Sequence, residues 1–533
     1  MTAGGRATDD AESPVLVGPD ALSLADIVAV ARREARVELT EGARATVVRA
    51  RDHVEALAAG DEPAYGVSTG FGALATRHIP VEQRAKLQRS LIRSHAAGSG
   101  PEVEREVTRA MMLVRLRTLV SGHTGVRLEV VETLAGLLNA GLTPVVREYG
   151  SLGCSGDLAP LSHVALALIG EGQVRDQTGE LRDAAEALPA AGLAPVELAA
   201  KEGLALINGT QFIAAHGVLG LERMKYLLDH ADIIGAMSLE ALLGSVKPFA
   251  EQLHELRPYQ GTKHVAMRLR MLLEDSEMVV SHAHCHRVQD PYSLRCMPQV
   301  HGAARNAWLH LKEMLCVELN SVTDNPVILD AGHSISGGNF HGQPLAIPLD
   351  YATTAVSALG NISDRRTYLL LEGKEGLPRL LMKDIGINSG FMIPQYTSAA
   401  LASENKNLCF PASADSIPTS LGQEDHVSMG SISGRKLNMV LDNLEHILAV
   451  ELLSAAQAFD FRSPLKSSAL LEACHDEVRR HIDHANEDRI FGDDLDVAVH
   501  LIRDHVLLKA ADAAARAQSL NLEGEAHDLF GIY

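Results

Sequence analysis

The sequence predicts an all-α protein, in which a long central helical bundle follows a loop-rich N-terminal domain. Aromatic residues make up only 4% of the 533 residues, while alanine and leucine are abundant, which favours helices over a β-sandwich or barrel. Beyond Lys201, apolar residues recur with helical periodicity over long stretches, and strand signals are few. We expect the bundle to contain the stretches 217–243, 299–319, 345–371 and 431–459.

The chain divides into three predicted segments. Residues 1–13 are polar, acidic and glycine-containing, as in a disordered tail. Residues 14–205 form the N-terminal domain, whose first helix is expected at Ser23-Leu24-Ala25-Asp26 because this run has the pattern of a capping box. Residues 206–533 form the central bundle and the C-terminal helices. Within the N-terminal domain, the alanine- and proline-rich interval 184–195 is predicted to be a linker or surface hairpin.

Charge and cysteine usage restrict the class of protein. The formal net charge is −20 and the pI is near 5.6, so a basic surface for nucleic acid or an anionic membrane is not expected. Six cysteines in so long a chain, with no signal peptide in residues 1–14, predict free thiols in a reducing compartment. Apolar runs are too short or too often interrupted by charges to span a bilayer. We therefore expect a cytoplasmic enzyme that acts on a small molecule.

The tripeptide Cys154-Ser155-Gly156 is the first candidate for chemistry. Glycine at the third position allows its amide nitrogen to fold back onto the carbonyl two residues earlier. Loss of water from Ser155 would then leave an electrophile made from the backbone. A hydrolase nucleophile elbow, G-x-S-x-G, is the alternative, but Asp157 stands where its last glycine is required. An ordinary glycine-rich turn before a helix is the other alternative. Asp157, directly after the tripeptide, is expected to orient backbone groups for cyclisation, and capping of the following helix is its alternative role.

Three polar side chains lie in or beside glycine-containing loops elsewhere in the chain. Tyr65 falls in the loop predicted for residues 61–80, where it is either a functional phenol or a packed tyrosine. His95 ends a predicted helix and could simply interact with the helix dipole. Asn208 precedes a long helix, where its ordinary role would be an N-cap.

The second half of the chain adds further groups. Gln289, Tyr292 and Arg295 supply an amide, a phenol and a guanidinium that can hold a carboxylate through two hydrogen bonds. A structural salt bridge is the alternative role for Arg295. Phe340, in a glycine-rich turn, belongs either to the core or to a pocket wall. Glu424 lies in a polar run that could be a solvated helix start, but a partly buried carboxylate there could bind an imidazole.

A cluster of His282, His284, Cys285 and His286 resembles a metal site at first sight. Its spacing matches no paired structural zinc motif, so a histidine-rich surface loop is the preferred interpretation and no metal is predicted.

Taken together and in this order, the seven motifs from Tyr65 to Gly430 resemble those of the histidine ammonia-lyase family. The resemblance implies that Cys154, Ser155 and Gly156 cyclise autocatalytically into a methylidene-imidazolone (MIO) electrophile, with no external cofactor. Most of the family has alanine where this chain has Cys154. Because that residue contributes only its carbonyl carbon to the ring, cyclisation should still proceed, with a thiol beside the electrophile.

The resemblance also implies roles for the other matching residues and an assembly. A homotetramer is expected, with active sites that draw loops from more than one subunit. The implied roles are a general base for Tyr65; contacts with the substrate imidazole for His95 and Glu424; shaping of the electrophile and amine environment for Asn208, Gln289 and Tyr292; binding of the substrate carboxylate for Arg295; and a pocket wall for Phe340.

Glu424 favours L-histidine as the substrate, with trans-urocanate and ammonia as products. Aromatic lyases and aminomutases of this family usually have an amide at that point, and a phenyl ring would leave the carboxylate desolvated without a partner, at a cost of about 1–3 kcal/mol. A tyrosine or phenylalanine ammonia-lyase or aminomutase is the first alternative. A noncatalytic helical scaffold and a metal-binding module are the others, and the full polar set argues against the scaffold.

Overall fold

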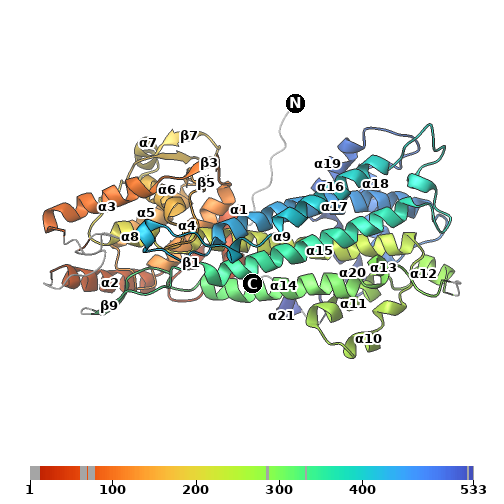
Figure 1. Ribbon diagram of the computed structural model, residues 1–533, viewed down its shortest axis with the longest axis horizontal. Helices are drawn as coiled ribbons and strands as arrows, with labels where there is room; N and C mark the ends of the chain where they lie inside the picture. Colours follow the sequence, from red (N-terminus) through yellow and green to blue (C-terminus); the bar gives the residue numbers. More distant parts are fainter. Residues whose placement is uncertain are drawn as a thin grey trace.

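Long, nearly parallel or antiparallel helices run through the centre of the computed structural model and form the predicted bundle (Figure 1). The structure describes residues 13–59, 69, 79–283, 287–330, 333–524 and 527–531. The bundle helices are α9 (Gln211–Ala241), α14 (Met297–Glu318), α15 (Gln343–Leu371) and α17 (Gly430–Asp460). Nearly every residue of α9 is buried, as expected for a helix that is apolar on all sides. The prediction of a mainly helical fold is confirmed.

The N-terminal part combines shorter helices with small sheets, and Figure 1 shows them gathered at one end of the molecule. Strands β1 and β2 pair in parallel, β3 pairs with β5, and β6 lies between β4 and β7, with antiparallel pairing in the last two sheets. The elements are β1 (Val15–Val17), α1 (Leu24–Arg32), β2 (Val37–Leu39), α2 (Glu41–Ala59), α3 (Val81–His95), β3 (Ser99–Glu102), α4 (Arg105–Leu119), α5 (Leu128–Asn139), β4 (Thr143–Pro144), β5 (Arg147–Tyr149), α6 (Leu158–Leu168), β6 (Gln173–Arg175), β7 (Leu181–Asp183), α7 (Ala184–Ala190) and α8 (Glu202–Ile207).

Shorter elements surround the bundle in the second half of the chain. A further hairpin, β8 with β9, is antiparallel. The elements are η2 (Lys247–Phe249), α10 (Glu251–Glu255), α11 (Gln260–Leu272), α12 (Glu277–Ser281), α13 (Tyr292–Arg295), β8 (Val327–Asp330), β9 (His333–Ile335), η3 (Arg379–Leu381), α16 (Met392–Leu408), η4 (Ala412–Ala414), η5 (Ser420–Gly422), α18 (Ala469–His481), α19 (Phe491–Arg503), α20 (Val506–Ala517) and α21 (His527–Phe530).

Local sequence signals predict several boundaries correctly. Ser23 caps α1, since its hydroxyl accepts the Asp26 N–H at 3.1 Å while the Asp26 carboxylate accepts the Ser23 N–H at 2.8 Å. The interval 184–195 is partly mispredicted, because α7 forms there and buries Ala184, Ala187 and Leu188 against the core. The tail of residues 1–13 lies almost wholly outside the described residues. The division of the chain at residue 205 stays an interpretation.

Buried ion pairs hold the bundle helices together. Asp232 of α9 accepts hydrogen bonds from Arg305 at 2.6 Å and Arg268 at 2.9 Å, and these positive charges hold the pKa of its carboxyl below the usual range. Arg366 of α15 binds Glu451 of α17 at 2.5 and 2.9 Å. Removing one partner of such a pair leaves a buried charge uncompensated, at a cost of about 3–5 kcal/mol. These pairs connect α9 with α11 and α14, and α15 with α17. No helix within the described ranges is both long enough and apolar enough to cross a membrane.

Candidate active site

The Cys154-Ser155-Gly156 segment lies between β5 and α6, against the loop that precedes α9. Gly156 has a φ of +79°, and a Cβ at this position would lie 2.1 Å from the carbonyl oxygen of Gly209. Two backbone hydrogen bonds join the loops: the Asp157 N–H donates to the Gly209 oxygen at 2.7 Å, and the Gly209 N–H donates to the Ser155 oxygen at 3.3 Å. Only glycine fits at residue 156, for reasons of both conformation and space.

Asp157 connects this segment to α9. Its carboxylate accepts the N–H groups of Phe212 and Ile213 at 2.9 and 3.0 Å and the Ser151 hydroxyl at 2.7 Å. These N–H groups belong to the first turn of α9, where a carboxylate is favoured by the helix dipole. Burial nevertheless raises the pKa of Asp157 to about 7. The side chain does not cap α6, the helix that directly follows it, so that alternative is wrong.

Glu424 contacts the tripeptide from the loop before α17. Its Oε1 lies 3.2 Å from the Ser155 hydroxyl, and its Oε2 accepts the Thr419 hydroxyl at 2.8 Å. Burial raises the pKa of Cys154 to about 12, and the negative charge of Glu424 adds to the effect. The Cys154 thiol therefore stays protonated at neutral pH. Glu424 does not start a helix but is half-buried beside Ser155.

His95 is the last residue of α3, and the negative charge of Glu424 acts on its pKa. Its Nδ1 is 2.9 Å from the Leu91 carbonyl oxygen and 3.0 Å from the Ser94 hydroxyl. Burial lowers the pKa of His95, and the Leu91 contact and Glu424 oppose this shift. A neutral ring that donates from Nδ1 to Leu91 leaves Nε2 as an acceptor. The helix-end interaction is thus present, and His95 also lies within electrostatic range of Glu424.

Asn208 is buried beside the tripeptide but is not an N-cap, since α9 begins at Gln211 with Thr210 before it. Its carbonyl accepts a hydrogen bond from Arg115 at 2.7 Å, and its side-chain NH₂ donates to the Asn325 carbonyl at 3.3 Å. Its Oδ1 is buried with no hydrogen-bond partner among the described residues. An unpaired buried acceptor is costly, so this oxygen can accept a hydrogen bond from a donor on a molecule that the site binds.

Phe340 lies in the loop before α15, near the same residues. The Gly337 N–H of this loop donates to Asn325 Oδ1 at 2.8 Å, and Asn325 also contacts Asn208. Next to Phe340, the ring of His341 stacks on that of His426 with 5.8 Å between centroids. Phe340 is half-buried, so it is neither a core residue nor fully solvated.

Gln289, Tyr292 and Arg295 lie elsewhere in the chain, in and just before α13. Gln289 is exposed, and Tyr292 is 71% exposed. The Arg295 guanidinium lies 4.7 Å from the centre of the Tyr292 ring. In the described part of the chain Arg295 makes no salt bridge, and its Nε is buried without a hydrogen-bond partner. The structural salt bridge proposed as the alternative for Arg295 is therefore not found there.

Helix α9 sets the distance between these two groups of residues. Its first turn binds Asp157, while the segment just after its last turn contacts Asp290, the neighbour of Gln289, through the Ser245 N–H at 2.6 Å. With 31 residues, α9 is about 45 Å long. Figure 1 shows α13 and α6 toward opposite ends of the molecule. One chain thus gathers one group of predicted residues and holds Gln289, Tyr292 and Arg295 far from it; the gathered group is His95, Cys154, Ser155, Gly156, Asn208, Phe340 and Glu424.

Two other predicted features lie outside this arrangement. Tyr65 falls outside the described residues, as do His284, Cys285 and His286. The His282 ring nitrogens lie 2.8 and 2.7 Å from the carbonyl oxygens of Met278 and Gly244. Within the ranges that the structure describes, no cluster of three His, Cys, Asp or Glu side chains could hold a metal ion.

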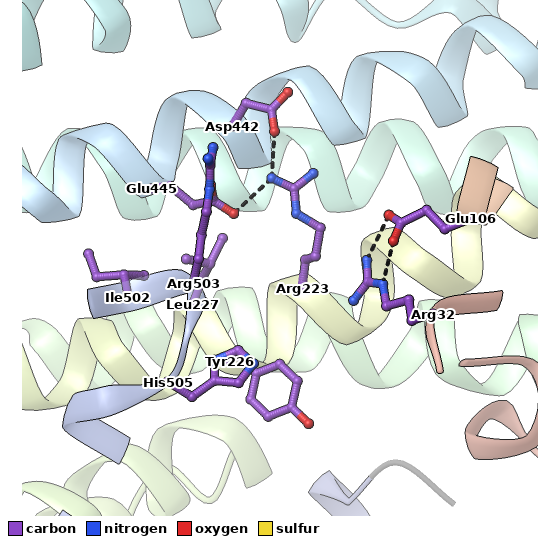
Figure 2. Close-up of a pocket in the computed structure, with 10 residues that line it drawn as sticks. All are labelled: Arg32, Glu106, Arg223, Tyr226, Leu227, Asp442, Glu445, Ile502, Arg503 and His505. Atoms are coloured by element: carbon purple, nitrogen blue, oxygen red, sulfur yellow. Dashed lines mark hydrogen bonds and ion pairs between the residues drawn. The ribbon is translucent and has the colours of Figure 1, made fainter. Parts of the chain in front are cut away.

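A cavity of about 310 Å³ lies away from the tripeptide, between α9, α17 and the α19–α20 region (Figure 2). None of the predicted site residues lines it. Arg223 pairs there with Asp442 at 2.5 Å and Glu445 at 2.8 Å, and Arg503 pairs with Glu445 at 2.6 Å. Its charged side chains pair with one another and no predicted site residue lines it, so this cavity is not the candidate site.

Sequence reasoning missed one side chain that positions the site, Arg115, and the partners of another, Asp157. Arg115 is fully buried in α4 and binds the carbonyls of Asn208 and Ala205. The sequence feature that could have revealed Arg115 is its position inside the apolar run 110–116. A buried helix tolerates a charged side chain only when that charge has partners. Asp157 was noticed, but its partners on α9 are 55 and 56 residues away in sequence.

The chain is similar to known proteins over most of its length. The aromatic amino acid lyase family matches residues 22–480. The histidine ammonia-lyase of Streptomyces avermitilis is 51% identical over 502 residues, which cover 93% of this chain and 98% of the relative. That of Myxococcus xanthus is 48% identical, covering 94% and 99%.

Solved structures extend the likeness to the fold. Histidine ammonia-lyase from Trypanosoma cruzi is 39% identical with a TM-score of 0.89, covering 98% of both chains. Tyrosine aminomutase from Streptomyces globisporus is 37% identical with a TM-score of 0.89, covering 94% of this chain and 99% of that one. On this extent of sequence and structural similarity, the chain belongs to the aromatic amino acid lyase family.

Proposed function

We propose that this protein is a histidine ammonia-lyase, which eliminates ammonia from L-histidine and releases trans-urocanate. The observation that carries the proposal is the half-buried carboxylate of Glu424, 3.2 Å from the Ser155 hydroxyl, with His95 close by. A substrate imidazole can donate to a carboxylate and accept from or donate to a neutral histidine. Relatives named histidine ammonia-lyase at about 50% identity support the same assignment.

The residues around Ser155 fit a methylidene-imidazolone group made from the chain itself. Glycine is the only residue that fits at position 156 against Gly209. The unpaired Oδ1 of Asn208, beside the tripeptide, can accept a hydrogen bond from the substrate amine. When formed, the group supplies an electrophilic carbon that binds the substrate amine and makes it a better leaving group.

The remaining steps fall to side chains. Arg295 binds the substrate carboxylate, for which its unpaired Nε and the absence of a salt bridge among the described residues leave it available. Tyr65 removes the β-proton, provided that its pKa falls below the free value of about 10. Gln289 and Tyr292 shape the amine environment, and Phe340 forms a wall of the imidazole pocket.

The two groups of residues come together in an assembly of several copies, which we propose is a homotetramer in the cytoplasm. Within one chain about 45 Å of helix α9 separates the tripeptide from the Gln289–Arg295 segment. A site that uses both must take them from different copies. The exposure of Tyr292 in the single chain is consistent with burial against a second copy.

Tyrosine and phenylalanine lyases or aminomutases remain the alternative because solved tyrosine aminomutases share the fold. Glu424 disfavours the phenylalanine enzymes, since a phenyl ring offers its carboxylate no hydrogen-bond donor. A phenol hydroxyl can donate to a carboxylate, so the comparison with tyrosine rests on the activity test. The direct test is to incubate the purified enzyme with L-histidine, L-tyrosine and L-phenylalanine and follow the unsaturated acid by ultraviolet absorption and ammonia by a coupled assay. Urocanate formed faster than coumarate or cinnamate supports the proposal, and preference for tyrosine or phenylalanine contradicts it.

A further inference from the structure

Asp290 is a buried carboxylate between two exposed residues of the predicted site, Gln289 and Tyr292. Only 7% of Asp290 is exposed. Its Oδ2 accepts the Ser245 N–H at 2.6 Å, and its Oδ1 accepts a hydrogen bond from Arg287 at 2.8 Å. Both carboxylate oxygens therefore have partners, and neither partner belongs to the substrate-binding set.

These contacts attach the Gln289–Arg295 segment to the C-terminal end of α9. Ser245 follows that helix by a few residues, and Arg287 also donates to the carbonyl of Leu242, the C-cap residue, at 3.3 Å. A guanidinium is favoured there because the helix end carries partial negative charge. Arg287 pairs in addition with Glu375 at 2.5 Å, which connects the segment to the turn after α15.

A second, weaker contact holds the other side of the segment. Arg366, fixed by its buried pair with Glu451, lies 3.4 Å from the carbonyl oxygen of Ser293 in α13. The side chains of Gln289 and Tyr292 are exposed and contribute little to fixing their own backbone. Asp290 thus supplies the hydrogen bonds that attach this backbone to the end of α9, while Leu294, buried in the core, holds α13 by packing.

We propose that Asp290 is a positioning residue for the lyase reaction. It holds the backbone that presents Gln289, Tyr292 and Arg295 to the electrophile of a neighbouring copy, and so it acts through them without touching substrate. This inference rests on the proposed function. A misplacement of reacting groups by 1 Å can cost about 100-fold in rate, so loosening this attachment should be visible in turnover.

The test compares Asp290→Ala with Asp290→Asn. Alanine removes both contacts, whereas asparagine keeps an oxygen for the Ser245 N–H and loses the ion pair with Arg287. We expect kcat to fall about 100-fold in Asp290→Ala and less in Asp290→Asn. In both variants the proteolytic peptide that contains residues 154–156 should keep the mass of the cyclised form. A change in KM with kcat unaltered overturns the proposal. Equal kcat in all three proteins, measured per mole of folded enzyme, also overturns it.

Hydrogen exchange gives a second readout that needs no substrate. Amides of residues 287–296 should exchange faster in Asp290→Ala than in the wild type, while those of residues 151–157 stay unchanged. The control is Asp488→Ala, which also removes a carboxylate that accepts backbone N–H groups, those of Ser389 and Gly390, but at an exposed position in a loop with no predicted site residue. It should change neither exchange in 287–296 nor kcat.

The two proposals fail in different ways. A wild type that converts no histidine contradicts the proposed function, and exchange still decides whether Asp290 fixes the segment. Unchanged exchange at 287–296 in Asp290→Ala overturns the positioning role, even in a protein that is a fully active lyase.

Discussion

The two ends of helix α9 differ in how they present functional residues. At the N-terminal end, Ser155, Gly156 and Asn208 are buried or half-buried, and backbone hydrogen bonds of Ser155 and Asp157 with Gly209 join their two loops. At the C-terminal end, Gln289 and Tyr292 are exposed on a short segment. The first end is partly shielded from water, and shielding favours the chemistry of an electrophile. The second resembles a surface that another copy completes.

Both ends use a buried aspartate, in ways that follow the helix dipole. Asp157 binds the free N–H groups of the first turn directly, because a negative charge is favoured there. At the other end the carboxylate of Asp290 reaches the last turn through the positively charged Arg287. One rigid helix therefore fixes both halves of the proposed site.

The largest expected effect comes from disabling each end in turn. Ser155→Ala should abolish ammonia release, because no electrophile can form, and Arg295→Ala should lower kcat/KM by about 100- to 1,000-fold. Mass spectrometry should show loss of two waters across residues 154–156 in the wild type and in Arg295→Ala only. Both variants should remain folded by circular dichroism.

Mixing these two inactive variants tests whether the ends meet between copies. If they do, co-expressed subunits should recover about a quarter of wild-type activity, since a site then needs one intact residue from each of two copies. No recovery in verified mixed oligomers would mean that both ends of a site come from one chain, against the 45 Å separation argued from α9.

Tyr65→Phe should reduce turnover by about 100- to 10,000-fold with little change in thermal stability, because it removes the ionisable oxygen of the predicted base. Co-expression with Ser155→Ala and, separately, with Arg295→Ala shows with which end Tyr65 works. Near-normal turnover would instead assign the proton transfer to another group, such as Tyr292.

Specificity should depend on the N-terminal end. In Glu424→Gln combined with His95→Leu, the ratio of kcat/KM for histidine over phenylalanine should fall about 100-fold, since each buried polar group left unpaired costs about 1–3 kcal/mol. The measurement is that ratio in the wild type and the double variant. A ratio that does not move would show that the imidazole is recognised elsewhere.

Asp157 predicts a pH dependence of stability at the same end. Burial raises its pKa from 3.8 to about 7, so the folded protein holds this proton more tightly than the unfolded chain. Its contribution to stability is complete below about pH 4 and is lost as the pH rises through about 7. Asp157→Asn should therefore flatten the fall of Tm across this range, and parallel Tm profiles of wild type and variant would contradict the raised pKa.

The smallest effect is expected at Cys154. Cys154→Ala should cyclise and turn over like the wild type, and wild-type Cys154 should resist alkylation at neutral pH because burial raises its thiol pKa to about 12. Peptide mapping after iodoacetamide treatment measures this, with the exposed Cys316 as an internal comparison. Rapid labelling of Cys154 in folded enzyme would contradict the burial argument.

The sequence by itself determined the helical class, the approximate limits of α9, α14, α15 and α17, and the residue types of the candidate site. Apolar periodicity and capping patterns are local, so they can be read without the fold. The positive φ of Gly156 is a local demand on the backbone, whereas its close approach to Gly209 depends on the tertiary structure.

Only the tertiary structure decided how those residues are distributed in space. It brought Glu424 to Ser155 across 269 positions and kept Gln289, Tyr292 and Arg295 at the far end of α9. It also assigned Asp157 and Asp290 their partners, and it made a short helix of part of the interval predicted to be a linker. Long-range packing and the pairing of buried charges depend on contacts between distant segments, and these leave no periodic signal in a single sequence.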